Sequence, residues 1–406
     1  MTKTSPKKLL IAAALWLAGA QAVAAPSVRP EVGEPLQAAQ QALQSRQYKD
    51  ALARIAQAEK VGGLSAYESY LVARLRAAAA QGAGDYAAAV SAYETALASP
   101  EFPAAEKLQV LDALAKLAYA AKKYDKAADT IQQYQAAGGS DPKTLGLLPQ
   151  ALYLSNDFAG AQKVLNAQLS QMEKAGQTPT ETQLQLLASC ALKQNDTAGY
   201  VAALEKLVRY HPQESYWLDL LTRTVNKPGF SDKLALDVYR LRLHTGTLRT
   251  AADYMEAAQL ALQAGLPGEA EAVVKQGYEK KLLGTGTPQE VDRHKRLADL
   301  VARKIAEDKP TLAEGEQAAA AQAGGDALVA TGMNYVGYGD YEKGIALIRQ
   351  GIAKGGLKRA DQAKLQLGYA QLVAGRKDEA VETFSGVKGS DGSADLARLW
   401  LLQARS

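Results

Sequence analysis

A pattern of small and bulky apolar residues recurs along the chain at a nearly constant interval. In the stretch GDYEKGIALIRQG, residues 339–351, a Gly-Asp turn precedes the small residue Gly344, and the bulky Ile348 follows four positions later. The corresponding small residues, called anchors here, are Ala51, Ala89, Ala127, Ala161, Tyr200, Ala235, Ala270, Gly344 and Ala380. Successive anchors lie 34 to 39 residues apart, except for one gap of 74 that leaves room for a degenerate copy between Leu283 and Ala327.

This spacing predicts an array of helical hairpins. Twelve residues before many anchors stands Gly or Ala, as at Ala77, Ala115 and Gly332. Small residues let two antiparallel helices approach closely, and the bulky residues fill the space between successive hairpins. Gly or Asn followed by Asp supplies the turn before the anchor. One hairpin cannot bury its apolar face alone, so repeats of this length indicate a stacked, all-α solenoid.

The pattern resembles that of the tetratricopeptide repeat family. The last copy matches with Leu367, Gly368, Gly375, Ala380 and Phe384, and the resemblance extends over residues 35–387. It implies a right-handed superhelical α-solenoid of helix-turn-helix hairpins. The expected organisation is a signal peptide over 1–24, repeats one to seven over 25–283, a degenerate repeat or linker over 284–327, and repeats eight and nine with a C-terminal capping helix over 328–406.

Three copies depart from the pattern. Tyr200 stands where the fifth copy should have a small anchor, and Pro149 takes the helix-contact position of the fourth. The sixth copy carries an irregular turn, NKPGFSD, over residues 226–232. We expect these copies to pack less regularly than the others.

The first residues predict export from the cytoplasm. Lys3, Lys7 and Lys8 precede an apolar run over 9–18, and Ala22-Val23-Ala24 forms a small-residue cleavage site, which is typical of a secretory signal peptide. A membrane anchor needs about 20 apolar residues, more than this run provides. No Cys lies near the cleavage site, so we expect a periplasmic protein, cleaved near Ala24, that is not a lipoprotein.

The net charge and the positions of Cys and His argue against several classes of function. The formal charge of +4 includes the three signal lysines and falls to +1 without them, which disfavours nucleic-acid binding. Cys190 is the only cysteine, and no base lies near it in sequence. The histidines, His211, His244 and His294, lack metal-ligand spacing. We therefore predict no enzyme activity, metal or cofactor, and interpret Cys190 as a small buried side chain.

The resemblance also implies a binding surface on the first helix of each hairpin. The residues at the family's groove positions are Arg74, Gln81, Asp112, Lys116, Tyr119, Lys143, Gln150, Tyr153, Gln185, Ser189, Gln259, Met333 and Tyr369. Together they describe a polar groove with tyrosines, a composition suited to peptide recognition. We expect envelope proteins or extended peptide segments as partners.

Two functions remain open at this point. The first is a periplasmic protein-binding scaffold or adaptor, because residues 216–283 resemble tetratricopeptide proteins that accompany TonB-type systems. The second is a carbohydrate-associated helper in exopolysaccharide export or cell-wall remodelling. A carbohydrate groove would favour exposed aromatic residues, so Tyr119 and Tyr153 are the positions that distinguish the two.

Overall fold

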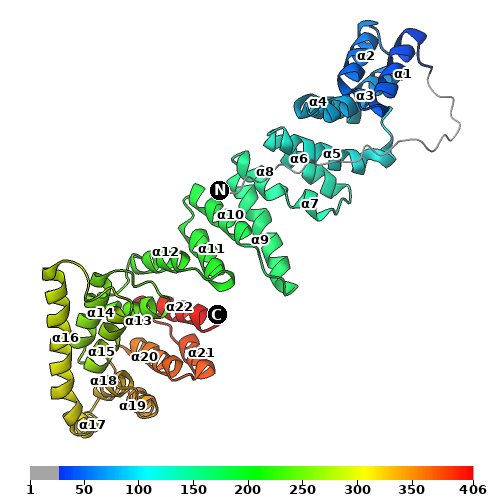
Figure 1. Ribbon diagram of the computed structural model, residues 1–406. Coiled ribbons are helices and arrows are strands. Elements are labelled where there is room, and N and C mark those ends of the chain that lie inside the picture. The colour runs from blue at the N-terminus through cyan, green and yellow to red at the C-terminus, as the bar shows by residue number, and fades with distance from the viewer. Residues whose placement is uncertain (1–26, 406) are drawn as a thin grey trace. The chain divides into compact units, whose positions relative to one another are not determined.

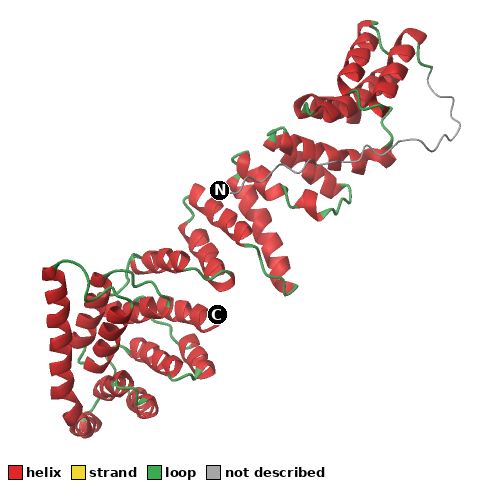
Figure 2. Cartoon of the chain, in the orientation of Figure 1, coloured by secondary structure: helices red, strands yellow, loops and turns green. Residues whose placement is uncertain are grey.

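The computed structural model describes residues 27–405, and these form helices joined by loops, with no strand among them (Figure 2). The predicted signal peptide, residues 1–24, lies outside the described residues. The chain divides into two compact units, an N-terminal unit up to Gln171 and a C-terminal unit from Met172. Over 27–405, no helix is both long and apolar enough to cross a membrane.

The N-terminal unit is a series of antiparallel hairpins (Figure 1). Its helices are α1 (Pro30–Gln44), α2 (Tyr48–Lys60), α3 (Ala66–Ala83), α4 (Tyr86–Leu97), α5 (Lys107–Ala120), α6 (Tyr124–Ala136), α7 (Pro142–Leu145), α8 (Leu148–Leu154) and α9 (Phe158–Lys174). Helices α1 and α2, α3 and α4, and α5 and α6 pack as pairs, and each pair contacts the next. The predicted stack of hairpins is confirmed.

The C-terminal unit is also built from hairpins, with an interruption at α16 and α17. Its helices are α10 (Glu181–Lys193), α11 (Thr197–Tyr210), α12 (Glu214–Val225), α13 (Ala235–His244), α14 (Ala251–Gln263), α15 (Pro267–Glu279), α16 (Pro288–Asp308), α17 (Leu312–Ala321), α18 (Asp326–Gly337), α19 (Tyr341–Lys354), α20 (Ala360–Val373), α21 (Lys377–Ser385) and α22 (Ser393–Arg405). Helix α15 packs directly on α18. The stack therefore passes by α16 and α17, which occupy the segment where the sequence predicts a degenerate repeat or linker.

The regular hairpins share one turn geometry. A residue with positive φ follows the first helix, and the next backbone N–H donates to a carbonyl five residues earlier, as from Asp157 to Leu152 at 2.8 Å. This is the Schellman arrangement, in which a left-handed residue satisfies the last carbonyls of a helix. The left-handed position is held by Arg46, Gly84, Lys122, Asn156, Asn195, Gly265, Gly339 and Gly375. The turn that the sequence predicts from Gly, Asn and Asp is thus also built with lysine and arginine.

The anchors lie where the two helices of a hairpin meet. Ala51, Ala89, Ala127, Ala161, Ala270 and Ala380 are fully buried. The approach is closest between α18 and α19, where a Cβ atom added at Gly344 would lie 2.7 Å from the carbonyl oxygen of Gly332. The helix backbones touch at this point, so only glycine fits.

The last helix, α22, packs inside the C-terminal unit as well as on its chain neighbours. It contacts α11 and α13 in addition to α20 and α21. Arg398 pairs with Glu205 of α11 at 3.0 Å. Trp400 is 1% exposed and stacks on Phe384 of α21, with ring centroids 5.9 Å apart. Trp400 is therefore a core residue, and its helix joins copies that are far apart in the chain.

Two glycine substitutions test this packing. Gly344→Ala should lower the free energy of unfolding by about 1–3 kcal/mol, because the added methyl group meets backbone atoms that cannot move aside. Gly315→Ala in α17 is the matched control, since its Cβ would meet open space and alanine favours a helix by about 0.5–1 kcal/mol. Urea denaturation of both variants measures the difference. Equal effects of the two changes would contradict the proposed helix contact.

Candidate functional site

Several predicted groove residues of the N-terminal unit lie together across stacked hairpins. Asp112, Lys116 and Tyr119 project from α5, and the Tyr119 hydroxyl donates to the Gln150 side chain on α8 at 2.8 Å. The Lys116 ammonium pairs with Asp112 at 2.7 Å and with Asp141, just before α7, at 3.1 Å. The Lys143 amide N–H and the Lys116 ammonium lower the pKa of Asp141. One ammonium thus bridges two carboxylates, and it ties α5 to the segment just before α7.

The other predicted residues of this unit have local roles. Gln81 on α3 accepts a hydrogen bond from the Tyr93 hydroxyl of α4 at 3.0 Å. Arg74, also on α3, is half-buried near Tyr70. Lys143 is exposed at the start of α7. The Tyr153 ring meets Phe158 edge-on at 5.3 Å.

The C-terminal unit contains a groove at two predicted positions. This inner groove has a volume of about 350 Å³. Its lining comes from α10, α11 and α12 and consists of Gln185, Ala188, Ser189, Leu192, Tyr200, Leu204, Leu207, Ser215, Tyr216 and Asp219. Gln185 and Ser189 are the two residues that the repeat register places there. The aliphatic members form an apolar lining, while hydroxyl, amide and carboxylate groups surround it.

A hydrogen-bond network orders one rim of the inner groove. The Tyr216 hydroxyl donates to a carboxylate oxygen of Glu181 at 2.5 Å and accepts from the Gln185 amide at 2.6 Å. Gln213 donates to the same Glu181 oxygen at 2.9 Å. Burial raises the pKa of Tyr216, and the adjacent Glu181 raises it further. The network joins α10 to α12 and so sets the width of the groove.

Tyr200 is a groove residue that the sequence interpretation missed. Its hydroxyl donates to Asp219 at 2.6 Å, and the Arg223 guanidinium lies 4.2 Å from the centre of its ring. Arg223 also donates to Asp219 at 2.8 Å. The signal was present in the sequence, because Tyr200 replaces a small anchor. A side chain of this size cannot fit between two touching helices, and it turns into the groove instead.

Three predicted positions lie outside the inner groove. Gln259 is exposed on α14. Met333 on α18 is 2% exposed and packs in the core with Val329 and Ile345, so it is removed from the candidate surface. Tyr369 on α20 lies against Trp400, with ring centroids 5.7 Å apart. The repeat register assigns Met333 to an exposed face, but neighbouring helices cover that face of α18.

A buried ion network lies beside Tyr369. The Arg240 guanidinium forms two hydrogen bonds of 2.7 Å to Glu269 and one of 2.7 Å to Asp237. Gln362 on α20 donates to Asp237 at 2.8 Å. Burial raises the pKa of Asp237, although Arg240 opposes the shift. Burial alone would lower the pKa of Arg240, but the two carboxylates raise it above its ordinary value. The network therefore joins α13, α15 and α20.

Among the described residues, the Cys190, His211 and His294 side chains are buried or bonded within the fold. Cys190 is fully buried, and burial raises the pKa of its thiol to about 11, so the thiol is protonated at neutral pH. His211 contacts the Pro179 carbonyl oxygen at 2.7 Å, and the Gly284 amide donates to His294 at 3.1 Å. Within residues 27–405, no group of three or more His, Cys, Asp or Glu side chains is arranged to hold a metal ion.

Comparison with family models and with curated proteins finds no match. Solved structures with similar helical arrays include yeast Tom70, which is 16% identical over 92% of this chain and 94% of that one, with a TM-score of 0.25. The TPR2AB domain of yeast Sti1 in its pHSP90 complex is 13% identical over 74% of this chain and all of that one, with a TM-score of 0.24. The C-terminal part of a TPR repeat-containing protein from Cytophaga hutchinsonii is 16% identical over 81% and 98%, with a TM-score of 0.25.

These TM-scores are too low for the similarity to bear on function. The assignment of the helices to tetratricopeptide-type hairpins rests on the chain itself, through its repeat length, its buried anchors and its shared turn.

The ion network provides a stability prediction. Arg240→Met should lower the free energy of unfolding by about 3–5 kcal/mol, because it leaves two buried carboxylates without a counterion. Arg303→Met, which removes an exposed pair with Glu307 at 4.0 Å, should leave stability nearly unchanged. Chemical denaturation of the two variants measures both effects. A small loss for Arg240→Met would show that water or a rearranged neighbour replaces the guanidinium.

Proposed function

We propose that this array of tetratricopeptide-type hairpins is a non-enzymatic scaffold that binds other proteins through the first helices of its hairpins. The observation that carries the proposal is the inner groove. Its apolar lining and its ordered polar rim lie at Gln185 and Ser189, which the repeat register selected as groove positions. An extended peptide in such a groove would bury apolar side chains and hydrogen-bond to the rim.

Leu192 gives the inner groove its apolar contact area. Its side chain is 48% exposed, although it lies beside Ala188 and Leu204. An exposed leucine in a groove loses water contact when a partner binds, and about 25 cal/mol per Å² of buried apolar surface favours the complex. Tyr216 adjoins the same space with an aromatic ring and a hydroxyl group, a combination enriched at protein interfaces.

We extend the proposal to location and pathway. The predicted signal peptide supports a periplasmic protein whose partners are envelope proteins. The resemblance of residues 216–283 to tetratricopeptide proteins of TonB-type systems supports an accessory role in TonB-dependent uptake. Both extensions rest on the sequence.

Affinity purification from cross-linked envelopes tests the proposal. Residues 25–406 are used as wild type and as Leu192→Glu, which places a charge in the inner groove at a position exposed enough to tolerate it. Val61→Glu in the N-terminal unit is the matched control, because Val61 is a similarly exposed aliphatic residue, at 38%, outside the inner groove. Circular dichroism checks that all three proteins fold alike.

We expect a specific envelope protein with wild type and with Val61→Glu, and its loss with Leu192→Glu. Recovery of a TonB-dependent receptor or its associated proteins would support the pathway. Equal recovery by all three proteins would place binding elsewhere. Recovery of polysaccharide without protein would contradict the scaffold proposal and favour the carbohydrate-associated alternative.

A further inference from the structure

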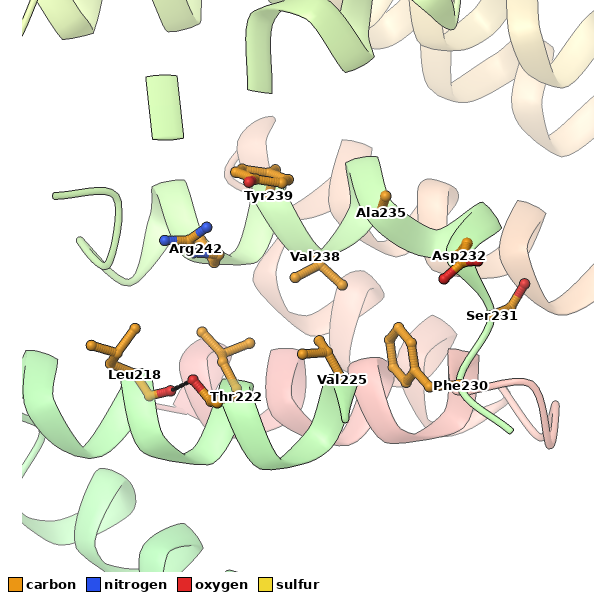
Figure 3. Close-up of a pocket in the computed structure, with 11 residues that line it drawn as sticks. Leu218, Thr222, Val225, Phe230, Ser231, Asp232, Ala235, Val238, Tyr239 and Arg242 are labelled. Carbon is orange, nitrogen blue, oxygen red and sulfur yellow. Dashed lines mark hydrogen bonds between the residues drawn. The ribbon is translucent and has the colours of Figure 1, made fainter. Parts of the chain in front are cut away.

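The two helices of the sixth hairpin, α12 and α13, stand apart. They contact each other far less than the helices of the regular hairpins do, and a groove of about 460 Å³ lies between them. We call it the α12–α13 groove (Figure 3). In a regular hairpin the surfaces that line this groove would be packed against each other. The inner groove and the α12–α13 groove share no lining residue, so the two grooves are distinct.

The turn and the last helix explain the separation. Residues 226–234 connect α12 to α13, where a regular turn such as 194–196 is much shorter. The long turn is fixed to the start of α22, because the Ser231 amide donates to the Asp391 carbonyl at 2.9 Å. The Phe230 ring lies on Gly392, where an added Cβ atom would come within 2.4 Å of it. Helix α22 also contacts α11 and α13, so it holds the helices before and after α12 as well as the long turn.

Each wall of the α12–α13 groove is a helical stripe. The α12 wall consists of Leu218, Leu221, Thr222 and Val225. The α13 wall consists of Ala235, Val238, Tyr239 and Arg242. Both sets follow the spacing i, i+3, i+4, i+7, which places their members on one face of a helix. Two facing stripes of this kind match the surface of a third helix that lies between them.

A charged side chain lies at each end of the α12–α13 groove, and only the one at the first end already has a charged partner. Figure 3 shows Arg242 near Leu218 at one end, and Asp232 near Phe230 at the other. The Arg242 guanidinium already binds Asp253 at 2.7 Å and the Thr247 carbonyl at 3.2 Å. The Asp232 carboxylate is exposed and has no ion pair or side-chain hydrogen bond within the described part of the chain. The groove therefore offers one unmatched negative charge, at the Asp232 end.

We propose that the α12–α13 groove binds one amphipathic helix of a partner protein, with an apolar i, i+3, i+4, i+7 stripe and a lysine or arginine at the end of that stripe beside Asp232. The helix restores the apolar packing that α12 and α13 lack, and its basic residue supplies the counterion of Asp232. The proposal rests on the function proposed above, namely that the chain binds proteins. It adds a second surface, inside a hairpin, that recognises a helix instead of an extended segment.

Synthetic helical peptides test this proposal without a natural partner. Two helix-forming peptides carry leucines at i, i+3, i+4 and i+7; one has a lysine at each end of the stripe and the other has a glutamate. A third peptide has the lysines but a scrambled leucine order. Fluorescence anisotropy measures the binding of each to residues 25–406. We expect the lysine peptide to bind at least about tenfold more tightly than the glutamate peptide, because only lysine is complementary to Asp232.

Two variants locate the binding in the α12–α13 groove. Asp232→Lys should reverse the preference between the lysine and glutamate peptides. Thr222→Arg should weaken binding at least about tenfold by filling the groove with a long charged side chain. Thr95→Arg is the matched control, because Thr95 and Thr222 are both exposed helix residues whose hydroxyls donate to the carbonyl four residues earlier, at 2.9 and 2.7 Å. Thermal melting verifies the fold of each variant.

Several results would overturn the proposal. One is that no peptide binds saturably to wild type. Another is that the scrambled peptide binds as tightly as the lysine peptide. A third is that Asp232→Lys keeps the wild-type preference between the lysine and glutamate peptides. Self-association that is lost in Thr222→Arg, detected by sedimentation, would assign the groove to a second copy of this chain. Binding of the neutral dye N-phenyl-1-naphthylamine that the lysine peptide cannot displace would assign it to a small apolar molecule. Leu192→Glu should bind the lysine peptide normally, so this result is independent of the test of the inner groove.

Discussion

The close approach of two antiparallel helices at small residues is the contact on which the whole array depends. Where the anchor is Ala or Gly, the helices of a hairpin pack with their backbones near each other, as Gly332 and Gly344 do. The bulky residue one turn later, such as Ile55 or Ile131, is then fully buried. The left-handed turn fixes the start of the second helix relative to the end of the first, so the contact recurs at each regular repeat.

The candidate surfaces arise at copies that depart from the small-anchor pattern. Tyr200 is too large for an anchor, and its side chain joins Asp219 and Arg223 in the inner groove. The sixth hairpin has a long turn, held against α22, and its helices separate to form the α12–α13 groove. Irregular copies therefore provide the space in which a partner can bind, while regular copies hold that space at a fixed width. The Arg240 network contributes to the same rigidity, because it joins three helices of the C-terminal unit around buried charges.

Much of the fold was predictable because it depends on short-range patterns. The anchor spacing, the turns and the burial of the Ala anchors follow from periodicity and composition, and the structure agrees. The site was less predictable, because it depends on contacts between distant copies. Gln185 and Ser189, chosen from the repeat register, line the inner groove, and Tyr119 donates a hydrogen bond to Gln150. Met333 was misplaced, and Tyr216 and Asp219 were missed, because a register gives the face of a helix but not what covers it.

Native-state amide hydrogen exchange measures how firmly each hairpin is held closed, since it reports local opening along the whole chain. We expect faster exchange for α12 and its turn, residues 214–234, than for the closed hairpin of α14 and α15, residues 251–279. Hairpin six lacks the close helix contact that resists opening. Equal protection of the two segments would mean that α12 and α13 are closed in solution, and would contradict both the open hairpin and the groove between its helices.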